Sequence, residues 1–168
     1  MPRPSLLAAT TLLAAACSNS TVPGADAPPP PQVDAAVDAA VGGLVINEIA
    51  AAGDPVDWFE LVNTGTTPID LTGLVFIDSG DPADAAPLSA ATLAPGAYHV
   101  ELVDDAGAGF KLGGDEELSI LRLSDGGLVA TVDWNEGDSP AGGSFARIPD
   151  GHGPFMTVVT DTQGQAND

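Results

Sequence analysis

LVINEIAAAGDPVDWFELVNTGTTPIDLTGLVFIDSG, residues 44–80, is the stretch that decides the fold of this chain. Its apolar runs are short, and Gly, Pro, Asn or Asp separates each run from the next. Alternation of apolar and polar residues between such turn residues is typical of β-strands that pack on one face. In the run from Trp58 to Asn63, the alternation places Phe59 and Leu61 on the same face. The stretch therefore predicts the first strands of an all-β domain.

Runs of the same kind continue beyond residue 80, and one pair of them is joined by a strong hairpin signal. Ser124-Asp-Gly-Gly127 separates two apolar runs, and Asp-Gly pairs favour tight turns between antiparallel strands. The alternation breaks at Ile120-Leu121, which predicts a β-bulge there. Seven to nine short strands at this spacing predict a β-sandwich. The predicted strands are Leu44–Ala51, Trp58–Asn63, two short runs on either side of Gly73 within 69–78, Tyr98–Val103, Leu118–Leu123, Leu128–Trp134, Phe145–Ile148 and Phe155–Val159.

Six motifs and a closing segment follow one another along this part of the chain. They are INEIAA (46–51), WFELVNTG (58–65), DLTGLVF (70–76), LAPGAYHV (93–100), LSDGGLVATVDW (123–134), SFARIPDG (144–151) and TDTQGQAN (160–167). In this order they resemble the lamin tail domain, and the resemblance covers residues 44–168. It implies an immunoglobulin-like β-sandwich. Because a fold does not fix a function, the resemblance implies a binding or structural module without naming its target.

The first sixteen residues have the three parts of an export signal. Arg3 supplies the positive charge, an apolar run follows, and Ala14-Ala15-Ala16 provides small residues for cleavage. The run is shorter than the roughly 20 apolar residues that a membrane-spanning helix needs. LLAAAC (12–17) resembles the lipobox of bacterial lipoproteins, in which the cysteine becomes the lipid-modified first residue. We therefore expect lipidation at Cys17; the alternative is ordinary signal-peptidase cleavage with an incidental cysteine.

Residues 18–43 have the composition of a linker. They are rich in Pro, Ala, Gly and Asp and contain no aromatic residue, and such a composition does not form a packed core. The chain thus divides into a lipoprotein signal peptide (1–16), a lipidated cysteine with a disordered tether (17–43) and a lamin-tail-like domain (44–168). Ser18, where inner-membrane lipoproteins have Asp, resembles outer-membrane cargo. We expect a place in the bacterial cell envelope, on the periplasmic face or outer surface of the outer membrane.

The chain is strongly acidic, with 24 acidic and 4 basic residues and a formal net charge of −20. Removal of residues 1–16 takes away Arg3 and no acid, which leaves 3 − 24 = −21. Because nucleic acids bind proteins chiefly through Lys and Arg, this charge argues against nucleic-acid binding. We expect two partners: the membrane, through acyl chains on Cys17, and an unidentified protein or surface polymer. Trp58 and Trp134 either present an exposed aromatic face to that partner or pack in the core.

Two kinds of chemistry compete with this binding role. Asp78-Ser79-Gly80 after an apolar run resembles the motif of aspartic proteases, whose mechanism needs a second carboxylate and hence a homodimer. The motif indicates either a small envelope hydrolase or protease that uses loop carboxylates, or a strand-end turn. Acidic loops such as the one with Asp78, Asp81 and Asp84 offer oxygen ligands for structural calcium, but they lack the EF-hand spacing. We expect a non-enzymatic protein and assign no catalytic, cofactor or metal residue.

Overall fold

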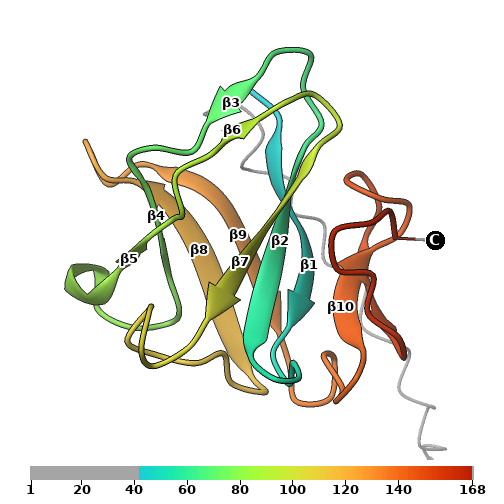
Figure 1. Ribbon diagram of the computed structural model, residues 1–168. Coiled ribbons are helices and arrows are strands. Elements are labelled where there is room, and N and C mark those ends of the chain that lie inside the picture. Colours follow the sequence, from blue (N-terminus) through green and yellow to red (C-terminus); the bar gives the residue numbers. More distant parts are fainter. Residues whose placement is uncertain (1–41, 168) are drawn as a thin grey trace, which may run out of the picture. The chain divides into compact units, whose positions relative to one another are not determined.

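The structure, a computed structural model, describes residues 42–167. The expected signal peptide, Cys17 and nearly all of the tether lie outside the described residues. Within them the chain forms eleven β-strands and one short 3-10 helix, which confirms the all-β prediction (Figure 1). The elements are β1 (Leu44–Ala50), β2 (Asp57–Asn63), β3 (Ile69–Asp70), β4 (Leu74–Ile77), η1 (Pro82–Asp84), β5 (Ala86–Pro87), β6 (Thr92–Leu93), β7 (Tyr98–Val103), β8 (Glu116–Arg122), β9 (Leu128–Trp134), β10 (Ser144–Arg147) and β11 (Phe155–Val158).

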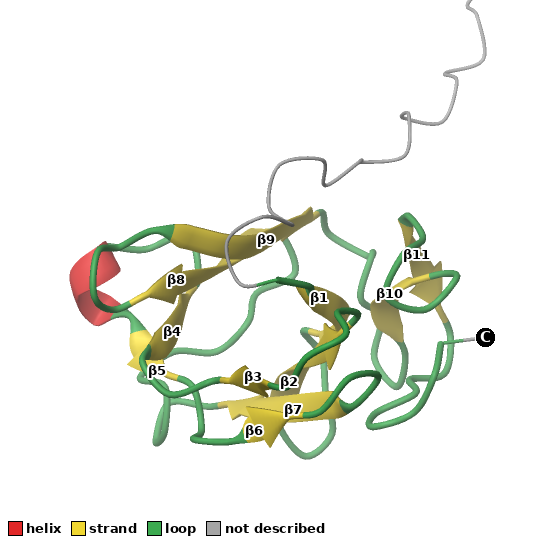
Figure 2. Ribbon diagram, turned by 90° about the horizontal axis from the view of Figure 1, so that it is seen from above, coloured by secondary structure: helices red, strands yellow, loops and turns green. Residues whose placement is uncertain are grey.

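The strands form two main antiparallel sheets that face each other across the core. One sheet has the order β11-β10-β1-β2-β7 and the other the order β5-β4-β8-β9, while β3 and β6 form a separate two-stranded ribbon. Figure 2 shows β4, β8 and β9 on one side of the interior and β1, β2 and β7 on the other. This arrangement is the predicted β-sandwich.

The core is built from the side chains that alternation predicted to face inward. Phe59 and Leu61 of β2 are fully buried in it. Phe76 of β4 packs edge-to-face on Phe59, with ring centroids 5.1 Å apart, and on Phe110 at 5.7 Å. Burial of an aromatic side chain of this size contributes about 1.5–3 kcal/mol. Since the chain has one cysteine, these contacts hold the two sheets together without an intrachain disulfide.

Strand β1 contains a bulge that turns two polar side chains away from the core. The pairing with β2 shifts register between Ile46 and Glu48, so Asn47 is an extra residue and Glu48 lies opposite Glu60. Because a bulge resets the alternation, Ile46 and Ile49 both face the core although they are three positions apart. Asn47 and Glu48 are thereby placed beside Glu60, on the outer face of the five-stranded sheet.

Strands β8 and β9 form the predicted hairpin, including its bulge. The register shifts between Ile120 and Leu121, where the alternation breaks in the sequence. The extra residue is Val129 in the opposite strand, and Val129 and Ala130 both belong to the core. In the turn, Gly126 has a φ of 68°, a conformation that glycine adopts without steric cost.

Three short elements were not predicted. β5 and β6 have two residues each, too few to show an alternating pattern, so the described strands number eleven where seven to nine were expected. The helix η1 begins after Asp81, whose carboxylate accepts a hydrogen bond from Ala83 N at 3.0 Å. A capping bond starts η1, and pairing of two residues with a neighbouring strand forms β5 and β6, so hydrophobic periodicity identifies none of the three.

The interpretation of Trp58 or Trp134 as an exposed binding aromatic is wrong. Trp58 is 4% exposed and Trp134 is 0% exposed. Trp134 belongs to the core, and its Nε1 donates to Gly113 O at 2.9 Å, which satisfies the polar end of the indole. Neither tryptophan therefore offers an exposed aromatic face.

Candidate functional site

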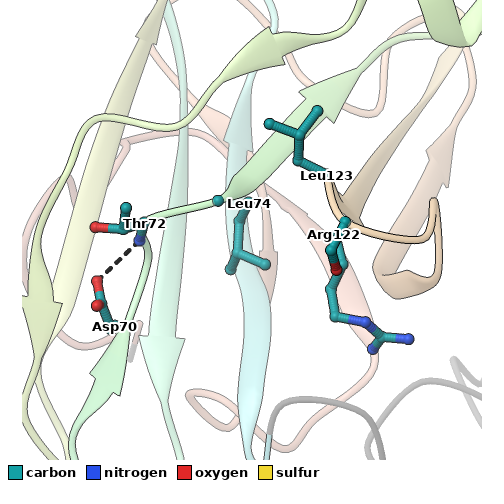
Figure 3. A pocket seen from close by; sticks show the side chains of 7 residues that line it. Asp70, Thr72, Leu74, Arg122 and Leu123 are labelled. Carbon is teal, nitrogen blue, oxygen red and sulfur yellow. Dashed lines mark hydrogen bonds between the residues drawn. The ribbon is translucent and has the colours of Figure 1, made fainter.

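An open hollow lies between the turn that precedes β4 and the β8–β9 hairpin (Figure 3). Its volume is about 530 Å³. Leu74 is 6% exposed, whereas Leu123 is 71% exposed, and the two side chains point in different directions. The hollow therefore combines a buried apolar residue with a freely accessible one. Its lining consists of Asp70, Thr72, Gly73, Leu74, Arg122, Leu123 and Ser124.

Tight turns fix the walls of this hollow. Asp70 Oδ1 accepts a hydrogen bond from Thr72 N at 2.9 Å, drawn as the dashed line in Figure 3. Gly73 follows with a φ of 81°. Leu123 N donates to Gly73 O at 2.8 Å, so the end of the hairpin is tied to the turn before β4. Backbone hydrogen bonds thus hold Leu123 in place although its side chain is exposed.

The polar rim of the hollow carries ionised groups. Hydrogen bonds from the backbone and hydroxyl of Thr72 lower the pKa of Asp70. Arg122 of the lining is paired with Asp125 in the adjoining turn, with Nε 3.1 Å from Oδ1. Hydrogen bonds from the Arg122 side chain and then from Gly127 N lower the pKa of Asp125. The rim is therefore charged at neutral pH. A fixed apolar residue beside charged groups suits the docking of an amphipathic partner.

A second exposed leucine lies on the same hairpin. Leu128 begins β9 opposite Leu121 and is 44% exposed. Loops and turns on a rigid scaffold commonly carry binding residues. We call Leu123, Leu128 and the hollow together the hairpin surface.

A cluster of Ser89, His99 and Glu101 lies along β7, where no site was predicted. Glu101 accepts hydrogen bonds from Ser89 Oγ at 2.9 Å and Ser89 N at 2.8 Å, and it contacts His99 Nε2 at 3.0 Å. A serine triad needs the histidine between the serine and the acid, whereas here the acid lies between the other two. This arrangement leaves Ser89 without a contact to the imidazole that would take its proton.

The electrostatics of the same cluster favour a structural role. Burial raises the pKa of Glu101, but hydrogen bonds from His99 and Ser89 and the charge of His99 outweigh it, so the pKa is lowered. The only signal in the sequence is the His99-x-Glu101 spacing, which places both side chains on one face of a strand. Ser89 lies in a loop and carries no such signal.

Two carboxylates are fully buried on the outer face of β1 and β2. Glu48 and Glu60 are opposite each other, and residues of the C-terminal segment cover them: Thr162 N donates to Glu48 at 2.9 Å and Gly164 N to Glu60 at 2.7 Å. We call Glu48 and Glu60 the carboxylate pair. Sequence reasoning missed it, although two acids within apolar strand segments were a visible signal.

The aspartic-protease-like motif forms a turn at the end of β4. Asp78 Oδ1 accepts a hydrogen bond from Gly80 N at 3.0 Å, and Ser79 Oγ accepts one from Glu117 N at 3.1 Å. The first bond closes the turn, and the second ties the turn to the backbone of β8. This geometry is that of the strand-end turn, the second of the two interpretations of the motif.

The acidic loops use their carboxylates to cap local backbone. Asp81 caps η1, Asp104 Oδ1 accepts from Gly107 N at 2.6 Å and Asp138 Oδ2 accepts from Asn135 N at 2.9 Å. Within residues 42–167, no three His, Cys, Asp or Glu side chains are grouped so that they could hold a metal ion. The loop with Asp78, Asp81 and Asp84 is therefore not assembled as a calcium site in this part of the chain.

A second, smaller hollow lies at the start of β2. It measures about 300 Å³ and is lined by Gly53, Pro55, Val56, Asp57, Asp104 and Lys111. Burial raises the pKa of Asp57 against the effect of a hydrogen bond from Gly53 N. Lys111 Nζ lies 3.9 Å from Asp105, and both side chains are largely exposed. The hollow has neither an exposed apolar anchor nor a buried charged group.

The remaining predicted site, Cys17, lies outside the described residues. In the region from Gly42 to Asn167, no helix is long and apolar enough to cross a membrane. Lipidation and the cleavage site thus stay predictions.

Comparison with known proteins identifies the family. The family model named Lamin Tail Domain matches residues 38–136, more than half of the chain, and this range includes β1 to β9. No curated protein and no solved structure matches the chain. The motifs from Ser144 onward lie beyond the matched range, although β10 pairs directly with β1. The sandwich and the match agree with the resemblance seen in the sequence, and the chain belongs to the lamin tail domain family.

Proposed function

We propose that this protein is a lipid-anchored, non-enzymatic component of the bacterial cell envelope. Its immunoglobulin-like domain would bind another protein or a surface polymer. The export signal and Cys17 support the anchor, and membership of the family supports a structural or binding module. The observation that carries the binding role is the exposure of Leu123, 71%, beside an open hollow on a hairpin held by turn hydrogen bonds.

The energetics favour the hairpin surface as the contact. Full burial of a leucine side chain contributes about 1.5–3 kcal/mol, and Leu123 and Leu128 keep much of that contribution available. The hairpin needs little reordering on binding because Leu123 N is already bonded to Gly73 O. The polar rim, with Arg122 and Asp125, would set the orientation of the partner.

Affinity capture from envelope extract tests the binding role. The bait is the soluble domain, residues 43–168, and the test variant carries Leu123→Ser and Leu128→Ser. Leu102→Ser is the matched control, since Leu102 is 55% exposed on β7, in the other sheet. We expect a partner that the bait and the control retain and the double variant loses. Equal capture by all three baits would remove the hairpin surface from the proposal.

Mass spectrometry of the mature N-terminus tests the anchor. We expect the first residue to be Cys17 with acyl chains on its sulfur and amine, because two or more chains give stable membrane attachment. Cys17→Ala should release the protein from the membrane fraction. An unmodified mature N-terminus would contradict the anchor and leave the binding role standing.

A protease assay tests the non-enzymatic assignment. Purified protein should show no pepstatin-sensitive proteolysis, because Asp78 bonds the turn that it forms and Ser79 bonds the backbone of β8. Asp78→Asn is the control that separates this motif from a contaminating protease. Activity that is present in the purified protein and lost in this variant would revive the hydrolase alternative.

A further inference from the structure

The C-terminal segment, residues 160–167, lies on the outer face of the five-stranded sheet beside β10 (Figures 1 and 2). Asn167 is its only buried residue, and Asn167 Nδ2 donates to Asn47 O and Arg147 O, both at 3.2 Å. The other side chains of the segment are half-buried or exposed and none is a large apolar residue. We call this segment the strap. It is held by polar contacts, so its opening costs far less than global unfolding.

The main polar contacts of the strap are made to the carboxylate pair. Thr162 N and Oγ1 donate to Glu48 at 2.9 and 2.8 Å, and Gly164 N donates to Glu60 at 2.7 Å. Neither glutamate has exposed surface. The strap therefore both satisfies the two carboxylates and shields them from water.

When both glutamates of the carboxylate pair are ionised, two like charges lie side by side on neighbouring strands. Residues directly opposite in an antiparallel pair have their Cβ atoms about 4.5–5.5 Å apart. The other hydrogen bonds to the pair come from neutral donors: Ser144 Oγ donates to Glu48 at 2.5 Å and Asn47 Nδ2 to Glu60 at 2.9 Å. Two buried carboxylates this close repel strongly when both are ionised, so one tends to retain its proton.

The surroundings of the pair add further negative charge. Asp150, in the loop after β10, accepts hydrogen bonds from Asn47 Nδ2 at 2.9 Å and from the Tyr98 hydroxyl at 2.7 Å. Arg147 of β10 donates to two backbone carbonyls and lies 4.4 Å from the ring centre of Phe155. Glu48 and Asp150 are the charged groups that act on Glu60. The other titratable or charged residues on the elements packed against this face are Tyr98 on β7, Arg147 on β10, His152 in the loop after β10 and Asp161 on the strap.

We propose that the strap is a proton-dependent latch: it closes over the sheet while the carboxylate pair holds one proton, and it loosens when both carboxylates ionise. Opening admits water to Glu48 and Glu60 and lets them separate their charges. Closure removes that water. Protonation of the carboxylate pair and closure of the strap therefore stabilise each other.

The direction of the pH dependence follows from Glu60. Burial, with the charges of Glu48 and Asp150, raises its pKa from 4.5 to about 7, against the hydrogen bonds from Asn47 and Gly164. A carboxyl whose pKa is higher in the closed state favours closure at low pH. That contribution is complete below about pH 4.5, is lost between pH 4.5 and about 7, and stays absent above.

Hydrogen–deuterium exchange of the full chain, corrected for intrinsic rates, tests the latch. The peptide covering residues 160–167 should lose protection by roughly ten- to thirtyfold between pH 5.5 and pH 8. Peptides from β8 and β9 serve as the internal reference and should change far less. A change below about threefold in the strap, or an equal change in the reference strands, would overturn the proposal.

Substitutions separate the latch from a general effect of pH. Glu60→Gln should make protection of the strap independent of pH, because the group that takes up the proton is gone. Glu101→Gln is the matched control: it removes another buried glutamate, and the pH dependence should persist. If Glu60→Gln keeps the pH dependence, the proposal is wrong. If that variant does not fold, the wild-type profile decides alone, because an uncoupled strap gives a flat one.

Discussion

Glu48 of β1 and Glu60 of β2 lie directly opposite each other, and neither has any exposed surface. The extra residue Asn47 is the cause, because without the bulge the alternation would send Glu48 toward the core. The same bulge puts the Asn47 amide within 2.9 Å of Glu60. A single irregularity in β1 thus creates both the carboxylate pair and one of its hydrogen-bond donors.

Glu60→Gln should change how stability depends on pH. The raised pKa means that wild-type stability falls as pH rises from about 4.5 to about 7, since the folded state holds a proton that the unfolded state has released. The amide replaces one acceptor with a donor, at a cost of about 1 kcal/mol at every pH. The free energy of unfolding of the variant, relative to that of the wild type, should therefore increase from pH 5 to pH 8, as measured by urea unfolding. If the variant and the wild type differ in unfolding free energy by the same amount at pH 5 and pH 8, the carboxylate pair does not hold a proton.

Ser89→Ala should weaken the contact between the loop before β6 and the edge strand β7. The variant loses one of the hydrogen bonds to the buried Glu101 carboxylate, a loss of about 1–3 kcal/mol. Because the pKa of Glu101 is lowered in the folded state, the ionised carboxylate stabilises the fold above about pH 4.5. That stabilisation is lost as pH falls below this value. Urea unfolding at pH 7 and pH 3.5 should show a large effect of the variant at pH 7 and a smaller one at pH 3.5. No change in the effect with pH would mean that the ionised carboxylate is not involved.

Much of this sandwich was predictable, and what was missed has a common physical origin. Strands such as Tyr98–Val103 and Leu128–Trp134 were predicted with the bounds that the structure gives, because turn residues bound each run in the sequence. Glu48 and Glu60 could not be predicted in this way, because polar residues in a strand are expected to face solvent. They are buried acids, and several of the hydrogen bonds that satisfy them come from the strap, more than a hundred residues away in sequence.

The candidate site was less accessible to sequence reasoning for a related reason. Exposure of Leu123 depends on where the hairpin ends relative to the turn at Gly73, which is a tertiary relation. Trp58 was expected on the face opposite Phe59 and could therefore be exposed. Its burial depends on residues that cover the outer face of the sheet, and alternation within β2 says nothing of them.

Gly73→Ala should destabilise the turn beside the hollow without any steric clash. The φ of Gly73 is 81°, and an added Cβ would meet no atom within 4 Å, so the cost is backbone strain of about 1 kcal/mol. Gly107→Ala is the control: this glycine lies outside the left-handed region, and an added Cβ would meet only the Asp104 side chain, with Oδ1 at 3.2 Å. Urea unfolding should show a loss of stability in Gly73→Ala and a smaller effect in the control. A neutral Gly73→Ala would mean that the turn relaxes, and the position of Leu123 would then be less fixed than its bond to Gly73 O indicates.

Asn47→Asp should be the most pH-sensitive single substitution on the outer face. Asn47 Nδ2 donates to Glu60 and to Asp150, both at 2.9 Å, and its Oδ1 accepts from Gly151 N at 2.8 Å. Aspartate keeps the shape and the acceptor but replaces both donated bonds with carboxylate contacts to carboxylates. Loss of a buried hydrogen bond to a charged group costs about 1.5–3 kcal/mol, and the added repulsion grows as the three acids ionise.

Asn47→Ala separates these two effects, because it removes the same donors without adding a charge. Both variants should be destabilised at pH 5, and the gap between them should widen toward pH 8 in urea unfolding. Protection of the strap amides should follow the same order, since Gly164 N and Asn167 N are bonded to Glu60 and Asp150. If Asn47→Asp and Asn47→Ala lose equal stability at pH 8, charge repulsion does not control this face, and the strap is held by its hydrogen bonds alone.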